Sequence, residues 1–136
     1  MIKIICGEKG TGKTKIITDL VNEVVKTAKG NVVFISQKKS YSANIDFNVR
    51  CVYTEDYAVD NISAFIGFVD GLMAGNSDIE YIFADGIMRI ADCGINDMQA
   101  LFVEAEKLQK EYGVKFVFTV SCAKENLPGY IAGYVD

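Results

Sequence analysis

The sequence predicts an α/β protein, a three-layer α/β/α sandwich around a mainly parallel five-stranded sheet. Short apolar runs alternate along the chain with longer segments whose apolar residues recur at helical spacing. Strands that alternate with helices in this way are joined by right-handed crossovers, so they lie parallel and the helices cover both faces. The chain has 136 residues, of which 50% are apolar, enough to bury one core. We therefore expect a single domain spanning residues 1–136.

A glycine-rich turn separates the first expected strand from the first expected helix. Residues 2–6 form an apolar run interrupted only by Lys3, which is typical of a strand buried on both faces of a parallel sheet, and the run ends at Gly7. From Lys13 the apolar residues recur with a helical period, which predicts an amphipathic helix. Gly30 occupies the position of its C-terminal cap.

Two further strands and a second helix are expected in the middle of the chain. Asp60 is placed to cap a helix whose apolar face runs from Ile62 to Met73, and Gly75 with Asn76 ends it. The second and third strands are the apolar runs at residues 32–35 and 50–53.

The last third of the chain predicts two strands around a third helix. Asn96 with Gln99 resembles a capping box at the start of this helix, and Gly113 ends it. The dipeptide Leu127–Pro128 opens at most a short final helix. The fourth and fifth strands are the apolar runs at residues 81–84 and 114–120.

The charge of the chain is distributed unevenly. Residues 1–40 carry eight lysines and three acids, whereas residues 41–106 carry two arginines and twelve acids. A long nucleic acid would be repelled by the acidic middle, but a small localised anion such as a phosphate suits the basic N-terminal part. We therefore expect a phosphorylated small ligand and no nucleic acid.

The remaining composition argues against a membrane protein and a zinc site. No apolar run approaches the roughly 20 residues of a membrane helix, and the N-terminus lacks the pattern of a signal peptide, so we expect a cytoplasmic protein. The four cysteines form no CxxC pair and the chain has no histidine, so no zinc site is expected.

The turn between the first strand and the first helix matches the phosphate-loop pattern GxxxxGK[ST] in full. Gly7 and Gly12 allow backbone conformations closed to residues with a side chain, so that successive N–H groups point at one anion. The helix adds unpaired N–H donors and the positive end of its dipole. Lys13 reaches the β- and γ-phosphates, and the Thr14 hydroxyl is placed to ligate magnesium. The predicted binding residues are Gly7, Glu8, Lys9, Gly10, Thr11, Gly12, Lys13 and Thr14.

A magnesium ion needs a second anchor, and a carboxylate at the end of a buried strand is suited to that role. Asp85 directly follows the apolar run at residues 81–84. Because magnesium gives up its hydration shell reluctantly, we expect Asp85 to act through water. The alternative interpretation is that Asp85 begins a turn with Gly86.

These residues resemble the motifs of the P-loop NTPase superfamily, with residues 7–14 as the Walker A motif and Asp85 as the Walker B aspartate. The segment between the motifs is similar to that of the additional-strand branch, which includes RecA-like ATPases and the thymidine kinases. The resemblance implies the P-loop NTPase fold, a fifth strand between the first and the fourth, and ATP with Mg²⁺ as the ligand. It also implies a polar sensor residue near the γ-phosphate at Ser121, or at Thr119 if the strand phase slips by two; a capping or turn hydroxyl is the alternative. The catalytic residues it predicts are Lys13, Asp85 and Ser121.

The sequence departs from that branch at the residue that orients the attacking water. The branch commonly has a glutamate at or next to the Walker B aspartate, whereas Asp85 is followed by Gly86. Arg89 either stabilises transition-state charge or pairs with surface acids. The acids that remain as candidate bases, each also interpretable as a solvated surface residue, are Glu8, Glu55, Asp56 and Asp92.

The sequence therefore predicts a small ATP-binding protein, with weak or partner-activated ATPase activity. One alternative is a regulatory module that binds nucleotide without hydrolysing it and recognises a protein partner or a second copy. The other is a small-molecule kinase, with acceptor-binding residues from the region 36–60. In that region the loop 36–48, with Lys38, Lys39 and Tyr41, either covers an adenine base or is a solvated loop.

Overall fold

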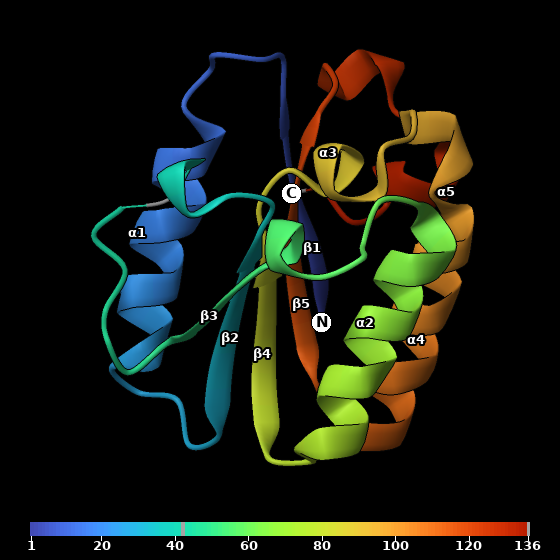
Figure 1. Ribbon diagram of the computed structural model, residues 1–136. Helices are drawn as coiled ribbons and strands as arrows, with labels where there is room; N and C mark the ends of the chain where they lie inside the picture. Colours follow the sequence, from blue (N-terminus) through green and yellow to red (C-terminus); the bar gives the residue numbers. More distant parts are fainter. Residues whose placement is uncertain (42, 136) are drawn as a thin grey trace.

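The computed structural model describes residues 1–41 and 43–135. All neighbouring strands of its five-stranded sheet are parallel, in the order β1-β5-β4-β2-β3 (Figure 1). The expected position of the fifth strand, between the first and the fourth, is therefore confirmed. The strands are β1 (Ile2–Gly7), β2 (Asn31–Ser36), β3 (Arg50–Tyr53), β4 (Ile79–Ala84) and β5 (Lys115–Ser121).

Helices flank both faces of this sheet. In Figure 1, α1 (Lys13–Val25) lies on one side of the strands, and α2 (Ile62–Gly75) and α4 (Gln99–Tyr112) lie together on the other. Two short helices, α3 (Ile87–Ala91) and α5 (Gly129–Ala132), lie near the carboxyl ends of the strands and on the α4 side. Among the described residues, no helix is long and apolar enough to cross a bilayer.

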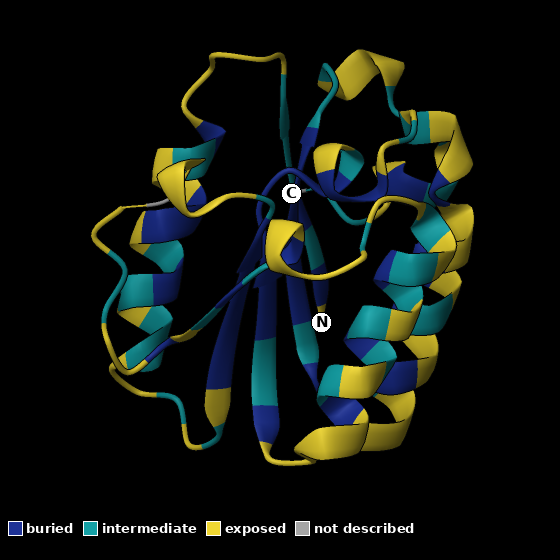
Figure 2. Cartoon of the chain, viewed as in Figure 1, coloured by how far each residue is buried: buried dark blue, intermediate teal, exposed yellow. Residues whose placement is uncertain are grey.

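The core consists of two apolar clusters, one on each face of the sheet. Successive strand residues point to opposite faces, so Ile82 joins the cluster under α2 and α4 while Phe83 joins the cluster under α1. Figure 2 shows the buried residues gathered along the strands, with the exposed ones on the outer helix surfaces and in the loops. Burial on both faces explains why the strands are continuous apolar runs.

The C-terminal segment covers the free edge of β1. The backbone N–H of Ile4 donates to the carbonyl of Tyr134 (3.0 Å), and the Tyr134 hydroxyl donates to Glu106 Oε1 (2.5 Å). The Tyr134 ring also stacks on Phe102, with centroids 5.5 Å apart. These contacts occupy an edge that would otherwise present unpaired backbone groups.

Gly30 does not cap the first helix as expected. The helix α1 ends at Val25 with Lys26 as its C-cap, and Gly30 instead begins the approach to β2. A Cβ atom at Gly30 would lie 2.5 Å from the carbonyl oxygen of Asp78, so the close approach of two loops requires glycine here.

Two expected N-caps are also wrong. Asn61 rather than Asp60 caps α2, since its Oδ1 accepts a hydrogen bond from the Ala64 N–H (2.8 Å). The expected capping box of Asn96 and Gln99 does not form, because residues 95–97 make a 3₁₀ turn and α4 begins after Met98 without a side-chain cap. The expected ends of α2 at Gly75 and Asn76 and of α4 at Gly113 are confirmed.

Glu80 ties the α1–β2 connection to β4. Its Oε1 accepts hydrogen bonds from the backbone N–H groups of Gly30 and Lys29, at 2.8 Å each, and Lys115 Nζ lies 3.5 Å from its Oε2. The pKa of Glu80 is lowered, first by the hydrogen bond from Gly30 and then by the hydrogen bond from Lys29 and the positive charge of Lys115. A carboxyl group whose pKa is lowered by folding stabilises the fold at pH values above its unfolded-state pKa. That stabilisation is lost as the pH falls through its folded-state pKa.

The Glu80→Ala variant should therefore lower the free energy of unfolding by about 1 kcal/mol at neutral pH. The difference in the free energy of unfolding between this variant and the unaltered chain should shrink as the pH falls below the ordinary glutamate pKa of about 4.3. Urea unfolding across that pH range measures it, with the exposed Glu111→Ala as the control. An unchanging difference across the pH range would contradict the role given to the carboxylate.

Candidate functional site

The carboxyl ends of β1, β5 and β4 lie side by side, and three connections meet above them. These are the glycine-rich loop between β1 and α1 (residues 7–14), the turn from β4 into α3, and the segment after β5. Ligands of parallel α/β sheets bind at this end of the strands, because the loops that vary in chemistry converge there. The sequence motifs at residues 7–14 and at Asp85 are thus brought together.

The glycine-rich loop needs its glycines for two different reasons. Gly10 and Gly12 both have φ of 85°, the left-handed region that favours glycine. The expectation of an unusual conformation is therefore confirmed for Gly12, and wrong for Gly7. A Cβ atom on Gly7 would instead lie 2.6 Å from Thr11 Oγ1, so glycine there allows the loop to close on itself.

The first turn of α1 presents free backbone donors to this end of the sheet. Gly12 is its N-cap, no side chain caps the helix, and the first turn contains no acidic residue. The first N–H groups of a helix have no intrahelical partner, and they carry the positive end of the helix dipole. This helix end therefore favours an anion.

Lys13 is buried and its ammonium is held over the loop. Lys13 Nζ donates to the carbonyl oxygen of Glu8 (2.9 Å), which also accepts a hydrogen bond from Thr11 Oγ1 (2.7 Å). Burial lowers the pKa of Lys13, repulsion from Arg89 lowers it further, and attraction to Asp85 works in the opposite direction. Glu8 thus contributes its backbone carbonyl, while its side chain is exposed.

Asp85 is almost completely buried, with 1% of its surface exposed, and both of its oxygens are engaged. Thr14 Oγ1 donates to Oδ2 (2.8 Å) and Thr119 Oγ1 donates to Oδ1 (2.6 Å). The Thr119 hydroxyl in turn accepts a hydrogen bond from the N–H of Gly86 (2.7 Å). The carboxylate therefore joins α1, β4 and β5 at one point.

Thr119 and Ser121 have different positions at the end of β5. Thr119 is buried and fixes Asp85, which makes it a structural partner of the carboxylate. Ser121 is half-buried and lies on the wall of the cavity described next. Both residues that the sequence singled out on this strand thus reach the site.

A cavity of about 240 Å³, here called the loop cavity, opens between these elements. Lys9, Gly10, Gly12, Lys13 and Thr14 line one side of it. Gly7, Glu8 and Thr11 belong to the same loop but are not part of the lining. The other lining residues are Asp85, Gly86, Arg89, Thr119 and Ser121.

Arg89 faces the loop cavity instead of pairing with surface acids. Its guanidinium packs on the backbone of Gly86, where a Cβ atom would lie 2.5 Å from a terminal guanidinium nitrogen, and lies 4.9 Å from the centre of the Tyr41 ring. Gln37 Nε2 also donates to the Arg89 carbonyl (3.4 Å). Within residues 1–41 and 43–135, no carboxylate forms a salt bridge with Arg89. Of the two roles that the sequence allowed for Arg89, it favoured pairing with surface acids, and the described residues form no such pair.

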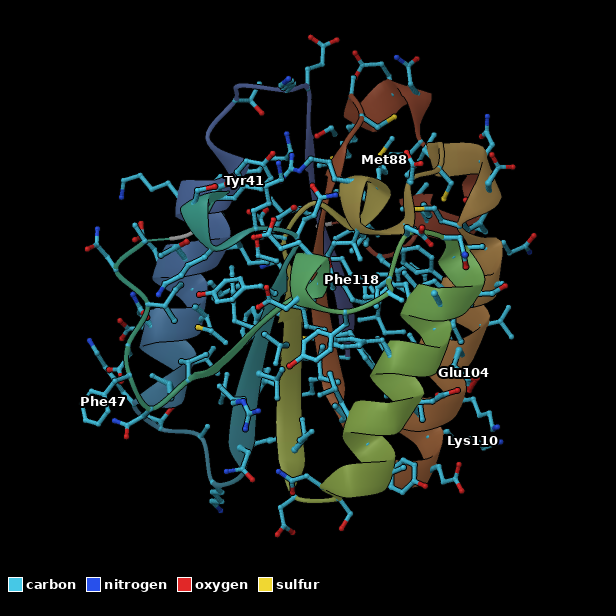
Figure 3. The ribbon with its side chains drawn as sticks, in the orientation of Figure 1. Tyr41, Phe47, Met88, Glu104, Lys110 and Phe118 are labelled. Atoms are coloured by element: carbon cyan, nitrogen blue, oxygen red, sulfur yellow. The ribbon has the colours of Figure 1, made fainter. Side chains whose placement is uncertain are left out.

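The described residues between 36 and 60 contact the site through Arg89, which is hydrogen-bonded to Gln37 and packs against Tyr41, without lining the loop cavity. Figure 3 shows Tyr41, above α1, and Met88, on α3, at the same end of the molecule. The 3₁₀ turn Thr54–Asp56 follows β3, which is separated from β4 by β2, and neither Glu55 nor Asp56 lines the loop cavity. No described residue between 36 and 60 lines the loop cavity, and the acceptor-binding role that the sequence allowed for this region stays a prediction.

In the part of the chain that the structure describes, no group of three or more cysteine, aspartate or glutamate side chains is arranged to hold a metal ion. Neither protein-family models nor curated proteins give a match to this chain.

The hydroxyl of Thr119 should be required for the position of Asp85. The Thr119→Val variant leaves a buried carboxylate oxygen and the Gly86 N–H without their partner, so it should lower the free energy of unfolding by about 2 kcal/mol. The Thr119→Ser variant keeps the hydroxyl and should cost clearly less. Urea unfolding of both variants tests this, and equal losses would show that the methyl group matters instead of the hydroxyl.

Proposed function

We propose that this protein binds ATP with Mg²⁺ in the loop cavity, and that it is a member of the additional-strand branch of the P-loop NTPase superfamily. The phosphates would lie against the glycine-rich loop and the first turn of α1, where backbone N–H groups and the helix dipole favour an anion. The strand order, with β5 between β1 and β4, supports this assignment.

The observation that carries the proposal is that three basic residues, Lys9, Lys13 and Arg89, line one small cavity that has, among the described residues, a single carboxylate in its lining. Lys13 comes from the glycine-rich loop and Arg89 from α3; burial lowers the pKa of Lys13, and the charge of Arg89 lowers it further against the attraction of Asp85. Within residues 1–41 and 43–135, Asp85 is the single acidic residue that lines the loop cavity, and both of its carboxylate oxygens already accept hydrogen bonds. Like charges that face one cavity are stabilised by an anion with several negative oxygens, as in a triphosphate.

Thr14 and Asp85 are suited to a hydrated magnesium ion. The Thr14 hydroxyl donates its proton to Asp85, so its oxygen lone pairs stay available to a cation. Asp85 is held rigidly by a second hydroxyl from β5 and would contact the ion through water. Bound magnesium would neutralise phosphate charge and fix the position of the terminal phosphate.

The loop cavity by itself supports nucleotide binding more strongly than rapid turnover. Asp85 is the carboxylate among its lining residues, and its engagement with Thr14 and Thr119 leaves it unsuited to accept a proton from water. Phosphate-loop proteins without a positioned base hydrolyse nucleotide slowly. We therefore propose a weak or partner-activated ATPase; the same observation also favours the alternative of a nucleotide-dependent interaction module that does not hydrolyse.

The Lys13→Ala variant should weaken the binding of ATP about tenfold to a hundredfold. The loss corresponds to one charge-assisted hydrogen bond of about 1.5–3 kcal/mol. The matched control is Lys15→Ala, since Lys15 lies on the same helix but is exposed and paired with Asp19. Titration with a fluorescent ATP analogue in the presence of magnesium measures both. Equal affinities in the two variants, or no binding by the unaltered chain, would contradict the proposal.

The Arg89→Ala variant should weaken ATP binding at least about tenfold, and ADP binding much less. A guanidinium at the Gly86 side of the loop cavity is placed to contact the terminal phosphate, which ADP lacks. The control is Arg50→Ala, which alters the other arginine of the chain, at the start of β3. Competition titrations with ATP and ADP measure the two affinities. An equal loss for both nucleotides would place Arg89 elsewhere along the phosphates.

A further inference from the structure

A second cavity adjoins the loop cavity on the α3 side. Its volume is about 380 Å³, and we name it the Asp92 cavity. Four residues line both cavities, so a molecule in one lies next to a molecule in the other: Lys9, Gly86, Arg89 and Ser121. The residues that line only the second cavity are Met88, Asp92 and Cys93.

The carboxylates of these adjoining cavities, Asp85 and Asp92, differ in burial and in hydrogen bonding, and therefore in their ability to accept a proton. Asp85 is buried and both its oxygens accept hydrogen bonds from threonine hydroxyls, whereas Asp92 is exposed on the cavity wall. Neither Glu8, Glu55 nor Asp56 lines either cavity. Of the four acids that the sequence left as candidate bases, Asp92 is the one on the wall of a cavity at this site.

Asp92 is held in place by the end of α3. Its backbone is in the left-handed region, with φ of 48°, and its N–H donates to the carbonyl of Arg89 (3.3 Å). The following residue closes the same turn, since the Cys93 N–H donates to the Met88 carbonyl (3.2 Å). Arg89 and Asp92 are therefore fixed by one short helix. Aspartate tolerates the left-handed region better than most residues with a side chain, and Asp92 is the C-cap of α3, where that conformation ends the helix.

From this arrangement we propose that the Asp92 cavity binds the hydroxyl nucleophile that attacks the terminal phosphate, and that Asp92 accepts its proton. The inference rests on the proposed function, because it requires a nucleotide in the loop cavity. The nucleophile's oxygen forms a bond to the γ-phosphorus, and the bond from that phosphorus to the bridging oxygen breaks. The electron pair of the broken bond leaves with ADP, and the proton passes to the Asp92 carboxylate.

The nucleophile is either water or a small alcohol. The cavity volume of about 380 Å³ is many times the ~30 Å³ that one water occupies in the liquid. Met88 offers an apolar wall, while Lys9 and Arg89 bring positive charge to the boundary with the loop cavity, where the developing phosphate charge would lie. A hydroxylated molecule of a few carbon atoms, as well as water, fits this lining.

The experiment compares Asp92→Asn with Asp97→Asn in the full-length chain. Asparagine tolerates the left-handed conformation, so the first variant removes the charge without straining the backbone. Asp97 is a close neighbour, since burial raises the pKa of Cys93 and the charges of Asp97 and Asp92 both raise it further, but Asp97 does not line the cavity. Asp92→Gly provides a second variant that accepts the same backbone conformation without a carboxylate.

Two measurements are made on each chain. The affinity for a fluorescent ATP analogue should be the same in all variants, while single-turnover transfer of the labelled γ-phosphate should fall about a hundredfold in both Asp92 variants and stay unchanged in Asp97→Asn. One arm contains buffer alone and the other contains glycerol as the alcohol probe. Label in inorganic phosphate identifies water as the nucleophile, and label in glycerol phosphate identifies an alcohol.

Three results would overturn the inference. These are unchanged transfer in the Asp92 variants, loss of nucleotide binding in them with Asp97→Asn unaffected, and no transfer to water or glycerol by the unaltered chain. Failure of the proposed function is distinguishable, because the unaltered chain would then bind no nucleotide at all. That result would remove the inference together with its basis.

Discussion

The buried carboxylate of Asp85 is the point on which the arrangement of the site depends. A charge taken out of water is costly unless polar partners surround it, and here Thr14 and Thr119 supply hydroxyls from α1 and β5. These contacts fix the start of α1, and with it the glycine-rich loop, relative to β4 and β5. In the proposed function, the same contacts leave Asp85 to orient a hydrated cation and not to accept a proton. One interaction thus both builds the loop cavity and limits its chemistry.

The short helix α3 links the two cavities. It begins after Gly86 and ends at Asp92, both in the left-handed region, so the chain reverses sharply at each end. Arg89 lies between them and reaches the loop cavity, while Asp92 lies on the wall of the second cavity. The ring of Tyr41 packs over the guanidinium, which connects the segment after β2 to the same helix. Arg89 therefore joins the lining of the loop cavity to a segment that follows β2.

Local patterns predicted the regular elements well and the irregular ones poorly. All five strands were found from apolar runs, since burial on both faces of a parallel sheet leaves a continuous signal. The five-residue helix α3 was missed because it is too short to show a helical period. The capping box at Asn96 failed because the chain there makes a 3₁₀ turn, with the Met98 N–H donating to the Tyr130 hydroxyl at 3.2 Å from a distant segment.

The sequence by itself determined the strands, the long helices and the phosphate-loop motif, because each depends on residues that are neighbours along the chain. It also singled out Asp85 and Thr119, although it ranked Thr119 below Ser121. The tertiary structure decided which of these side chains meet. Arg89 packs against Tyr41, and Thr14 bonds to Asp85 71 positions away, only because the order of the parallel strands brings their carboxyl ends together. Such contacts leave no periodic trace in the sequence, and the folded sheet alone selects them.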